Sequence, residues 1–220
     1  MSSPHLTFLE EIVLLALDDT SGALLPMPTM AFNYAVAGAV LCDLAVQNRI
    51  DTDPEQLVLV SREPTGDPLL DRALNKIVTT KTPLRVSGWL NVFSEDARNL
   101  ETAALDRLVA RGILRREEKK VLWVFGTRRY PTVDNQERTE VRTRLAALIL
   151  GDDLPDPRDA ILISLLTASH LIGKIFHGPE FTGRSERIAT LAKMDLVGRE
   201  VAASIDAVTK LISTGLPIGM

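Results

Sequence analysis

Apolar positions recur along most of the chain at three- and four-residue steps, which is the spacing of one face of an α-helix. The stretch LTFLEEIVLLALDD, residues 6–19, follows this spacing at Leu6, Leu9, Val13 and Leu17. The TSG that comes next is typical of a helix end. Residues 30–48, MAFNYAVAGAVLCDLAVQN, predict a second helix whose small side chains permit close packing.

The middle and C-terminal parts of the chain continue the helical pattern. Asp67 before Pro68 places a good N-cap ahead of a proline at the first helical position, and predicts a helix through about Val78. Two further helices are expected at residues 94–111 and 138–150.

Residues 159–176 are apolar on nearly all sides and predict a central buried helix, which ends before Gly178 and Pro179. A long amphipathic helix from about residue 185 to 212 follows. No linker rich in Pro, Gly and Ser divides the 220 residues. The sequence therefore predicts a single all-α domain over residues 1–220, with small β-hairpins.

A weak internal repeat predicts those hairpins. LAVQNRI (44–50), DTDPEQ and LVLV (57–60) recur 64 residues later as LVARGIL (108–114), RREEKK and VLWV (121–124). Each copy reads as a helix, a short turn and a strand-like alternation. The connector is acidic in the first copy and basic in the second.

The second copy lies in a basic stretch, residues 112–131, of a chain whose formal net charge is -4. Two Glu oppose six basic residues there: Arg115, Arg116, Lys119, Lys120, Arg128 and Arg129. Between the basic residues runs an apolar segment, Val121, Leu122, Trp123, Val124 and Phe125. Three interpretations are open: a wing that touches nucleic acid, a hairpin that enters a membrane surface, and a hairpin packed on its own core.

A winged helix would read DNA with the helix before the hairpin, residues 94–111. That helix carries three Arg against four acidic residues, so phosphates would repel it. Alternation along a strand instead places Trp123 and the apolar residues two positions from it on one face, and the other apolar residues of 121–125 on the opposite face. One face can pack inward while the other contacts lipid. We therefore expect no nucleic acid partner, and an attraction to anionic membrane lipids.

Catalysis finds little support in the sequence. His170 and His177 lie about two helical turns apart, too far to chelate one ion, and Cys42 sits in an apolar helix. Phosphate-loop, zinc-protease and nucleophile-elbow motifs do not occur. We expect no enzyme, no metal and no cofactor.

The N-terminus has no signal-peptide pattern, and the apolar stretch 160–176 falls short of the roughly 20 residues of a spanning helix. A single cysteine suits a reducing compartment. The expected location is cytoplasmic, with peripheral membrane association.

Several segments together resemble the Golgi phosphoprotein 3 family, peripheral membrane proteins that recognise phosphatidylinositol 4-phosphate. They are LTFLEEIVLLALDDTSG, PTGDPLLDRALNKI, VSGWLNVFS, LVARGIL and ASHLIGKIF, in family order. The resemblance implies one helical domain with a hydrophobic β-hairpin, here about 117–128, that inserts into the bilayer. It places the headgroup pocket at Pro28, Ala37, Arg98 and Glu101, of which only Arg98 is basic.

The sequence thus predicts a non-enzymatic adaptor that binds anionic lipid headgroups, phosphatidylinositol 4-phosphate by resemblance. The headgroup residues would be Arg98 and the six basic residues of 112–131, and the segment 121–125 would enter the bilayer. Homo-oligomers are expected through the same apolar surface. The alternatives are a winged-helix-like nucleic-acid-binding protein and a helical interaction module whose hairpin mediates oligomerisation.

Overall fold

The computed structural model describes residues 5–52, 56–119 and 127–194, together with the helical residues Val201, Ala203, Ile205 and Ala207. Its helices are α1 (Phe8–Leu15), α2 (Thr29–Val46), α3 (Pro68–Thr79), α4 (Val86–Ser94), α5 (Ala97–Ala110), α6 (Gln136–Leu150), α7 (Pro157–Ala168), α8 (Ile172–Ile175), the 3₁₀ helix η1 (Pro179–Phe181) and α9 (Ser185–Leu191). Its strands are β1 (Ile50–Thr52), β2 (Leu57–Leu59), β3 (Glu117–Lys119) and β4 (Thr127–Arg129). The predicted all-α class with small hairpins is confirmed.

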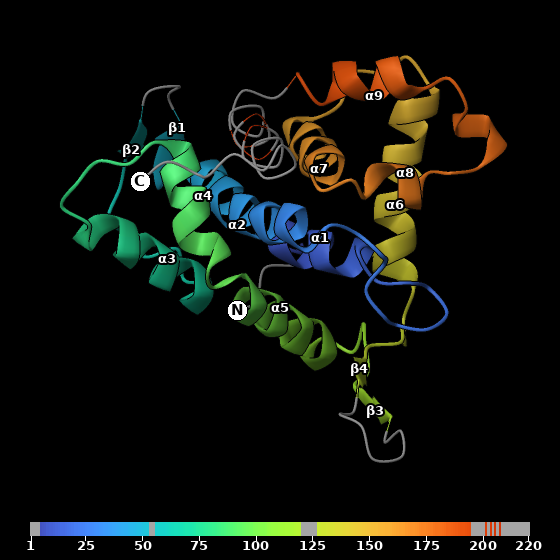
Figure 1. The fold of residues 1–220 in the computed structure, drawn as a ribbon, viewed down its shortest axis with the longest axis horizontal. Coiled ribbons are helices and arrows are strands. Elements are labelled where there is room, and N and C mark those ends of the chain that lie inside the picture. Colours follow the sequence, from blue (N-terminus) through green and yellow to red (C-terminus); the bar gives the residue numbers. More distant parts are fainter. Residues whose placement is uncertain are drawn as a thin grey trace.

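The helix α2 occupies the centre of the described structure, and α1, α3, α4, α5 and α7 pack around it (Figure 1). Nearly every α2 side chain from Ala31 to Ala45 is buried. Small residues allow this close approach: a Cβ on Gly38 would lie 2.5 Å from Cγ1 of Val201. The sequence predicted that residues 159–176 form the central buried helix. In the structure α2 occupies most of the centre, and α7 packs against it.

The helix α1 is fastened to α2 at its first turn. Asp43 of α2 accepts hydrogen bonds from the backbone N–H groups of Phe8 (3.0 Å) and Leu9 (3.3 Å). Thr7 and Glu10 form a reciprocal capping box, and the Glu11 N–H donates to the Thr7 carbonyl. All four N–H groups that a helix start leaves without intrahelical partners are thus satisfied, two of them by another helix.

Buried carboxyl groups gather beside this turn. Glu11 is buried and ion-paired with Arg158 at 2.6 Å and with Arg144 at 3.5 Å. Burial raises the pKa of Glu11 to about 7 although both arginines oppose the rise. Burial likewise raises the pKa of Asp43 to about 7, against the two N–H groups that it accepts from.

Both copies of the internal repeat end their helix in the same way. Asn48 after α2 and Gly112 after α5 adopt positive φ values of 54° and 76°. In each, the next residue donates back five positions, Arg49 to Leu44 and Ile113 to Leu108. This is a Schellman motif, which releases the chain into a hairpin directly after the helix. The strand predicted at 57–60 is present as β2. In the second copy the predicted turn RREEKK contains β3, and the predicted strand 121–124 lies outside the described residues.

The expected helix at 94–111 is wrong at its start. The chain forms α4, which ends at Ser94, and begins α5 at Ala97. The Ser94 hydroxyl donates to the Asn91 carbonyl, and this local bond competes with continued helix. Four apolar side chains at helical spacing form the buried face of α4: Val86, Trp89, Leu90 and Phe93.

The expected continuous helices at 159–176 and 185–212 are also wrong. His170 takes φ 60° and Leu171 donates back to Leu166, so a Schellman motif separates α7 from α8 without any glycine. The helix α9 ends at Leu191, and the chain turns there. Beyond this turn only Val201, Ala203, Ile205 and Ala207 are described, and they are helical.

Replacing Asp43 tests the fastening of α1. We expect Asp43→Ala to lower the free energy of unfolding by about 1–3 kcal/mol, because two buried N–H groups lose their acceptor. Asp43→Asn should lose less, since its amide oxygen still accepts. Urea unfolding monitored by circular dichroism measures both. Asp152→Ala, at an exposed loop position, is the control; an Asp43→Ala protein as stable as this control would contradict the cap.

The raised pKa values of Glu11 and Asp43 predict a pH dependence. The unfolded chain releases these protons near pH 4, whereas the folded chain keeps them until about pH 7. The folded state binds more protons in this window, so the free energy of unfolding should fall as pH rises from 5 to 7. Glu11→Gln should flatten this fall by up to about 1.4 kcal/mol per pH unit.

Urea denaturation at pH 5, 6, 7 and 8 provides the measurement. Glu186→Gln, on the exposed face of α9, is the matched control and should keep the wild-type slope. Stability that stays flat or increases across this range would show that both carboxyl groups ionise normally in the folded protein.

Candidate functional site

The hairpin of β3 and β4 projects from the helical body between α5 and α6 (Figure 1). Its strands are antiparallel, with Glu117 opposite Arg129 and Lys119 opposite Thr127. The base is held on both sides: the Arg115 N–H donates to the Pro131 carbonyl at 3.0 Å, and the Tyr130 N–H donates to the Gly22 carbonyl at 2.8 Å. Strand direction at the base is therefore fixed by the α1–α2 loop.

Gly22 makes this junction possible. It has φ +61°, and a Cβ there would lie 2.3 Å from the backbone nitrogen of Pro131. A side chain at this position would push β4 away from the loop. The sequence suggested the TSG tripeptide only as a helix end. Its glycine is also the point where β4 attaches to the α1–α2 loop.

Three predicted headgroup residues at the hairpin have partners within the chain. Arg115 pairs with Glu117 at 2.8 Å, although its side chain remains largely exposed. Arg116 pairs with Asp106 and lies over the Tyr130 ring, 6.0 Å from its centroid, and the Asp106 carboxylate raises the pKa of this guanidinium. Arg129 donates to the Ser21 carbonyl at 3.4 Å.

The other hairpin predictions cannot be placed in the same way. Lys119 and Arg128 belong to the two strands, but only their backbones are described. Lys120 and the predicted insertion segment, Val121, Leu122, Trp123, Val124 and Phe125, lie outside the described residues.

Arg98 lies in the first turn of α5, exposed at the surface. Burial raises the pKa of Glu101, one turn further on, and the Arg98 guanidinium opposes that rise. Of the other positions that the resemblance assigned to a headgroup pocket, Pro28 is the N-cap residue of α2 and Ala37 is completely buried inside α2. Arg98 and Glu101 therefore reach the surface here, and Ala37 does not.

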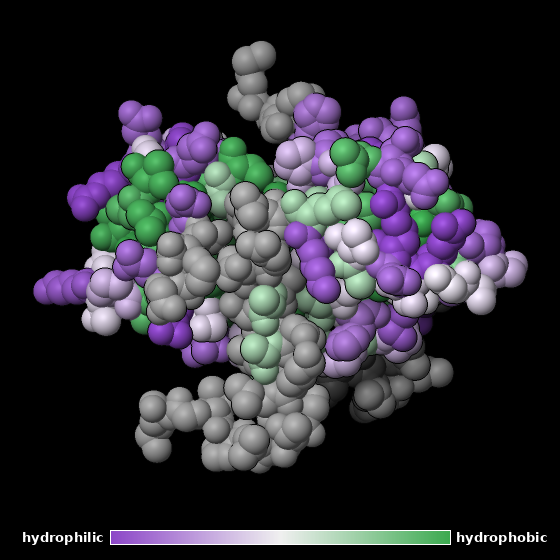
Figure 2. Space-filling view, turned by 90° about the horizontal axis from the view of Figure 1, so that it is seen from above, coloured by the Kyte–Doolittle hydropathy of each residue, from purple (hydrophilic) through white to green (hydrophobic). Residues whose placement is uncertain are grey.

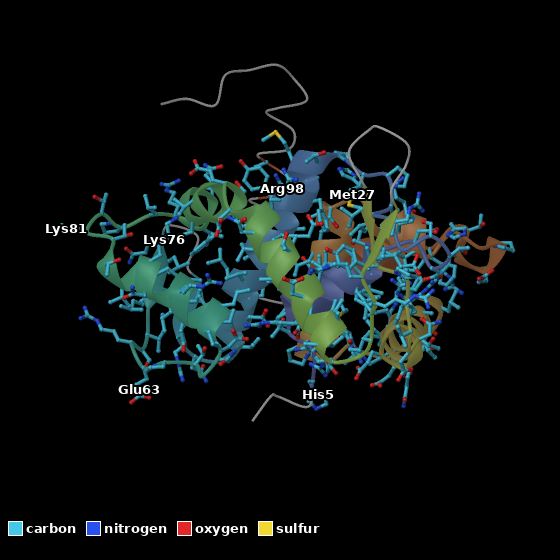
Figure 3. The ribbon with its side chains drawn as sticks, turned by 90° about the horizontal axis from the view of Figure 1, so that it is seen from below. His5, Met27, Glu63, Lys76, Lys81 and Arg98 are labelled. Carbon is cyan, nitrogen blue, oxygen red and sulfur yellow. The ribbon has the colours of Figure 1, made fainter. Side chains whose placement is uncertain are left out.

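An apolar loop lies on the same side as Arg98. Figure 3 labels Arg98 and Met27 along one edge of the molecule. Met27 belongs to the loop LLPMP before α2, and Leu24 of this loop and Met30 in the first turn of α2 are each 41% exposed. Sequence reasoning missed this loop, although two prolines among long apolar side chains were a usable signal for an exposed turn.

A second group of exposed apolar side chains lies on the other hairpin. Figure 2 shows apolar residues among hydrophilic ones at the end of the molecule that carries β1 and β2. Val58 and Val60 are exposed there. Positions two apart on a strand share a face, so these valines point away from the core side of Leu57 and Leu59.

The helix α5 does not present a basic face. Arg107 makes a bidentate pair with Asp67, at 2.6 and 2.7 Å. Partial burial alone would raise the pKa of Asp67, but the Arg107 guanidinium lowers it. Arg111 lies 3.8 Å from Glu10 and 3.9 Å from Glu137. Arg107 on α5 and Arg111 at its C-cap are thus committed to the protein itself, which disfavours a DNA-reading role.

The candidate catalytic residues remain apart. Cys42 is buried in α2, His170 forms the turn after α7, and His177 Nδ1 donates to the Lys174 carbonyl at 2.9 Å. Within the described ranges no group of three His, Cys, Asp or Glu could hold a metal ion.

Among the described helices, α2 is the one whose length and apolarity would let it cross a membrane. Most of it is buried by the surrounding helices, as in the core helix of a folded domain.

Comparison with known proteins connects this arrangement to one family. The sequence profile of Golgi phosphoprotein 3 (GPP34) matches residues 8–208. The chain belongs to the Golgi phosphoprotein 3 family. The family resemblance drawn from the sequence motifs is therefore confirmed over nearly the whole chain, including both hairpins and α6 to α9.

Two fungal relatives of this Golgi phosphoprotein 3 family member are similar over two thirds of its length. The vacuolar protein sorting-associated protein 74 of Eremothecium gossypii is 26% identical over 168 residues, which are 67% of this chain and 50% of the relative. The protein of the same name from Schizosaccharomyces pombe is 26% identical over 167 residues, 66% and 49%. The matched segment spans about half the length of these relatives.

Proposed function

We propose that this protein is a non-enzymatic peripheral membrane adaptor that docks reversibly on anionic lipid headgroups through the β3–β4 hairpin. The observation that carries the proposal is the placement of the hairpin. Its base is fixed to Gly22 and Pro131, its strands carry basic residues, and they lead away from the helical body toward the segment 121–125.

The expected binding free energies favour reversible docking on the membrane. Each apolar side chain of 121–125 that enters lipid contributes about 1.5–3 kcal/mol. Each basic residue near an anionic leaflet adds about 1 kcal/mol. Arg116 contributes less than this, because Asp106 already neutralises it. Two or three inserted side chains and a few cations give several kcal/mol, which suits an adaptor rather than a permanent anchor.

Arg98 would provide a second contact with headgroups. It is exposed on α5, and its label lies near that of Met27 in the view of Figure 3. Phosphatidylinositol 4-phosphate is the lipid that the family resemblance implies. A phosphomonoester needs several charge-assisted donors. Glu101 carries a negative charge where the resemblance places a basic donor, so it repels a phosphate there. We therefore propose recognition that depends on the negative charge of the surface, with Arg98 as one donor.

Family membership and the two relatives support a cytoplasmic, Golgi-associated adaptor. Self-association through the apolar surface of the hairpin would strengthen docking by avidity, because two linked copies dissociate more slowly than one.

Liposome flotation of a Trp123→Asp plus Phe125→Asp variant tests insertion. Vesicles are neutral, generally anionic, or doped with phosphatidylinositol 4-phosphate. We expect wild-type protein to float with the two anionic kinds, and the variant to lose at least about tenfold in binding, because two apolar side chains no longer enter lipid.

The control is Val60→Asp plus Leu154→Asp, which places the same charges on two exposed apolar positions elsewhere. It should float like the wild type. Recovery of the wild type with all three vesicles equally, or with none, would overturn the lipid proposal. An unfolded Trp123 and Phe125 variant by circular dichroism would indicate that the segment is core.

Asp106→Asn tests the electrostatic part. Removing this carboxylate releases Arg116 from its ion pair, so binding to anionic vesicles should strengthen severalfold. Asp152→Asn changes the net charge equally at a distant exposed loop and should strengthen binding much less. Equal effects of the two variants would show that only total charge matters.

A further inference from the structure

A cavity of about 440 Å³ lies between α6 and the segment that joins α8 to η1, and no residue of β3 or β4 lines it. The two walls stand beside each other in Figure 1. One stripe of α6 forms the first wall through Asn135, Arg138, Thr139, Arg142, Thr143 and Ala146. A helix face turned toward its own protein is usually apolar, but five of these six residues are polar.

The two arginines of this wall are held in place by hydrogen bonds to other parts of the protein. Arg138 is only 2% exposed, and it donates to Asp19 at 2.5 Å and to the Leu14 carbonyl at 2.7 Å. Arg142 donates to the same Asp19 at 2.6 Å and to the Ile175 carbonyl at 3.3 Å. One carboxylate thus serves two guanidinium groups, and the α6 side of the cavity lining holds two arginines and no acidic residue.

These guanidinium groups also keep unused donors. The Nε of Arg138 is buried and has no hydrogen-bond partner in the described part of the chain. Arg142 uses two of its five N–H donors in the bonds above. Arg138 is buried and Arg142 partly exposed, and guanidinium groups that are fixed and incompletely satisfied favour an additional oxyanion acceptor.

The threonines of the wall differ from several others on the helices, which bond within their own helix. Thr102, Thr167 and Thr190 each donate to the carbonyl four residues earlier, at 2.7 to 2.9 Å. Thr139 and Thr143 make no such bond among the described residues, and both line the cavity. Their hydroxyl groups are therefore available to a ligand.

The opposite wall combines three apolar residues with His177, Gly178 and Glu180. Phe176 and Phe181 pack against each other with ring centroids 5.2 Å apart, and Ile175 lies beside them. Across the cavity, Ala146 continues this apolar surface from α6. The cavity is thus polar and cationic toward Arg142 and apolar toward the two rings.

We infer that this cavity binds a small anionic amphiphile, whose oxyanion lies against Arg142, Thr139 and Thr143 and whose apolar body lies against Phe176 and Phe181. A phosphate ester has the required chemistry, whether it comes from a lipid or from a soluble metabolite. Nothing in the membrane-docking proposal uses these residues, so the two sites are independent.

Glu180 limits the charge that the cavity accepts. It also lines the cavity, and its carboxylate lies over Gly178, where a Cβ would approach Oε1 to 2.3 Å. An incoming oxyanion meets this negative charge on the second wall. Glu180→Gln should therefore increase affinity for the ligand severalfold, in the direction opposite to the loss of a donor.

Calorimetric titration of the full chain with hexyl phosphate, inorganic phosphate and hexanol tests the inference. We expect hexyl phosphate to bind at least about tenfold more tightly than either of the others, because only it uses both ends of the cavity. Thr139→Val plus Thr143→Val should weaken hexyl phosphate about tenfold or more, since two hydroxyl donors are lost.

Thr102→Val plus Thr190→Val is the matched control and should bind normally. The thermal midpoint of each variant shows that folding is retained. Arg142→Ala, checked in the same way, should also weaken binding. Absence of hexyl phosphate binding, equal affinity for hexanol, or unchanged affinity in the Thr139 and Thr143 variant would overturn the inference.

Flotation with phosphatidate vesicles separates the two sources of the ligand. Weaker flotation of the Thr139 and Thr143 variant, with weaker hexyl phosphate binding, assigns a lipid headgroup. Unchanged flotation with weaker hexyl phosphate binding assigns a soluble ligand. The Trp123→Asp plus Phe125→Asp variant should keep its hexyl phosphate binding, so failure of membrane docking would leave this inference standing.

Discussion

The bond between Asp43 and the first turn of α1 is the constraint on which the rest of the structure depends. A helix start must satisfy four backbone N–H groups, and α1 is buried along its whole length, so water cannot do so. Asp43 supplies two acceptors from the middle of α2. This fixes the two most buried helices in register, and α4, α5 and α7 then pack around a preset pair.

The buried pair of helices α1 and α2 also determines where charged side chains can lie. Glu11, Asp43 and Asp159 are buried, and Arg144 and Arg158 reach in from the periphery to meet two of them. Arg107 on α5 and Arg111 at its C-cap are likewise occupied by acidic partners on other segments. Exposed basic side chains remain at Arg98 and around α3, at Arg72, Lys76 and Lys81.

Much of this fold could be predicted because its signals are local. The N-cap at Asp67 with Pro68, and the capping pattern from Thr7 to Glu10, depend on neighbouring residues alone. The break at His170 could not be foreseen in this way, because a histidine with positive φ is held by the packing of Leu171 and Phe176 rather than by its own preference. The candidate site likewise combines features that the sequence predicts with features that it does not. The basic hairpin could be predicted from the local composition. The pairing of Arg116 with Asp106, ten residues away, depends on how α5 and β3 lie relative to each other.

The attachment of the hairpin base also has a mechanical consequence. β4 is bonded to the α1–α2 loop at Gly22, β3 follows directly from the Schellman motif of α5, and α6 begins a few residues after Pro131. Any displacement of β3 and β4 is therefore coupled to α5, to α6 and to the α1–α2 loop at the same time.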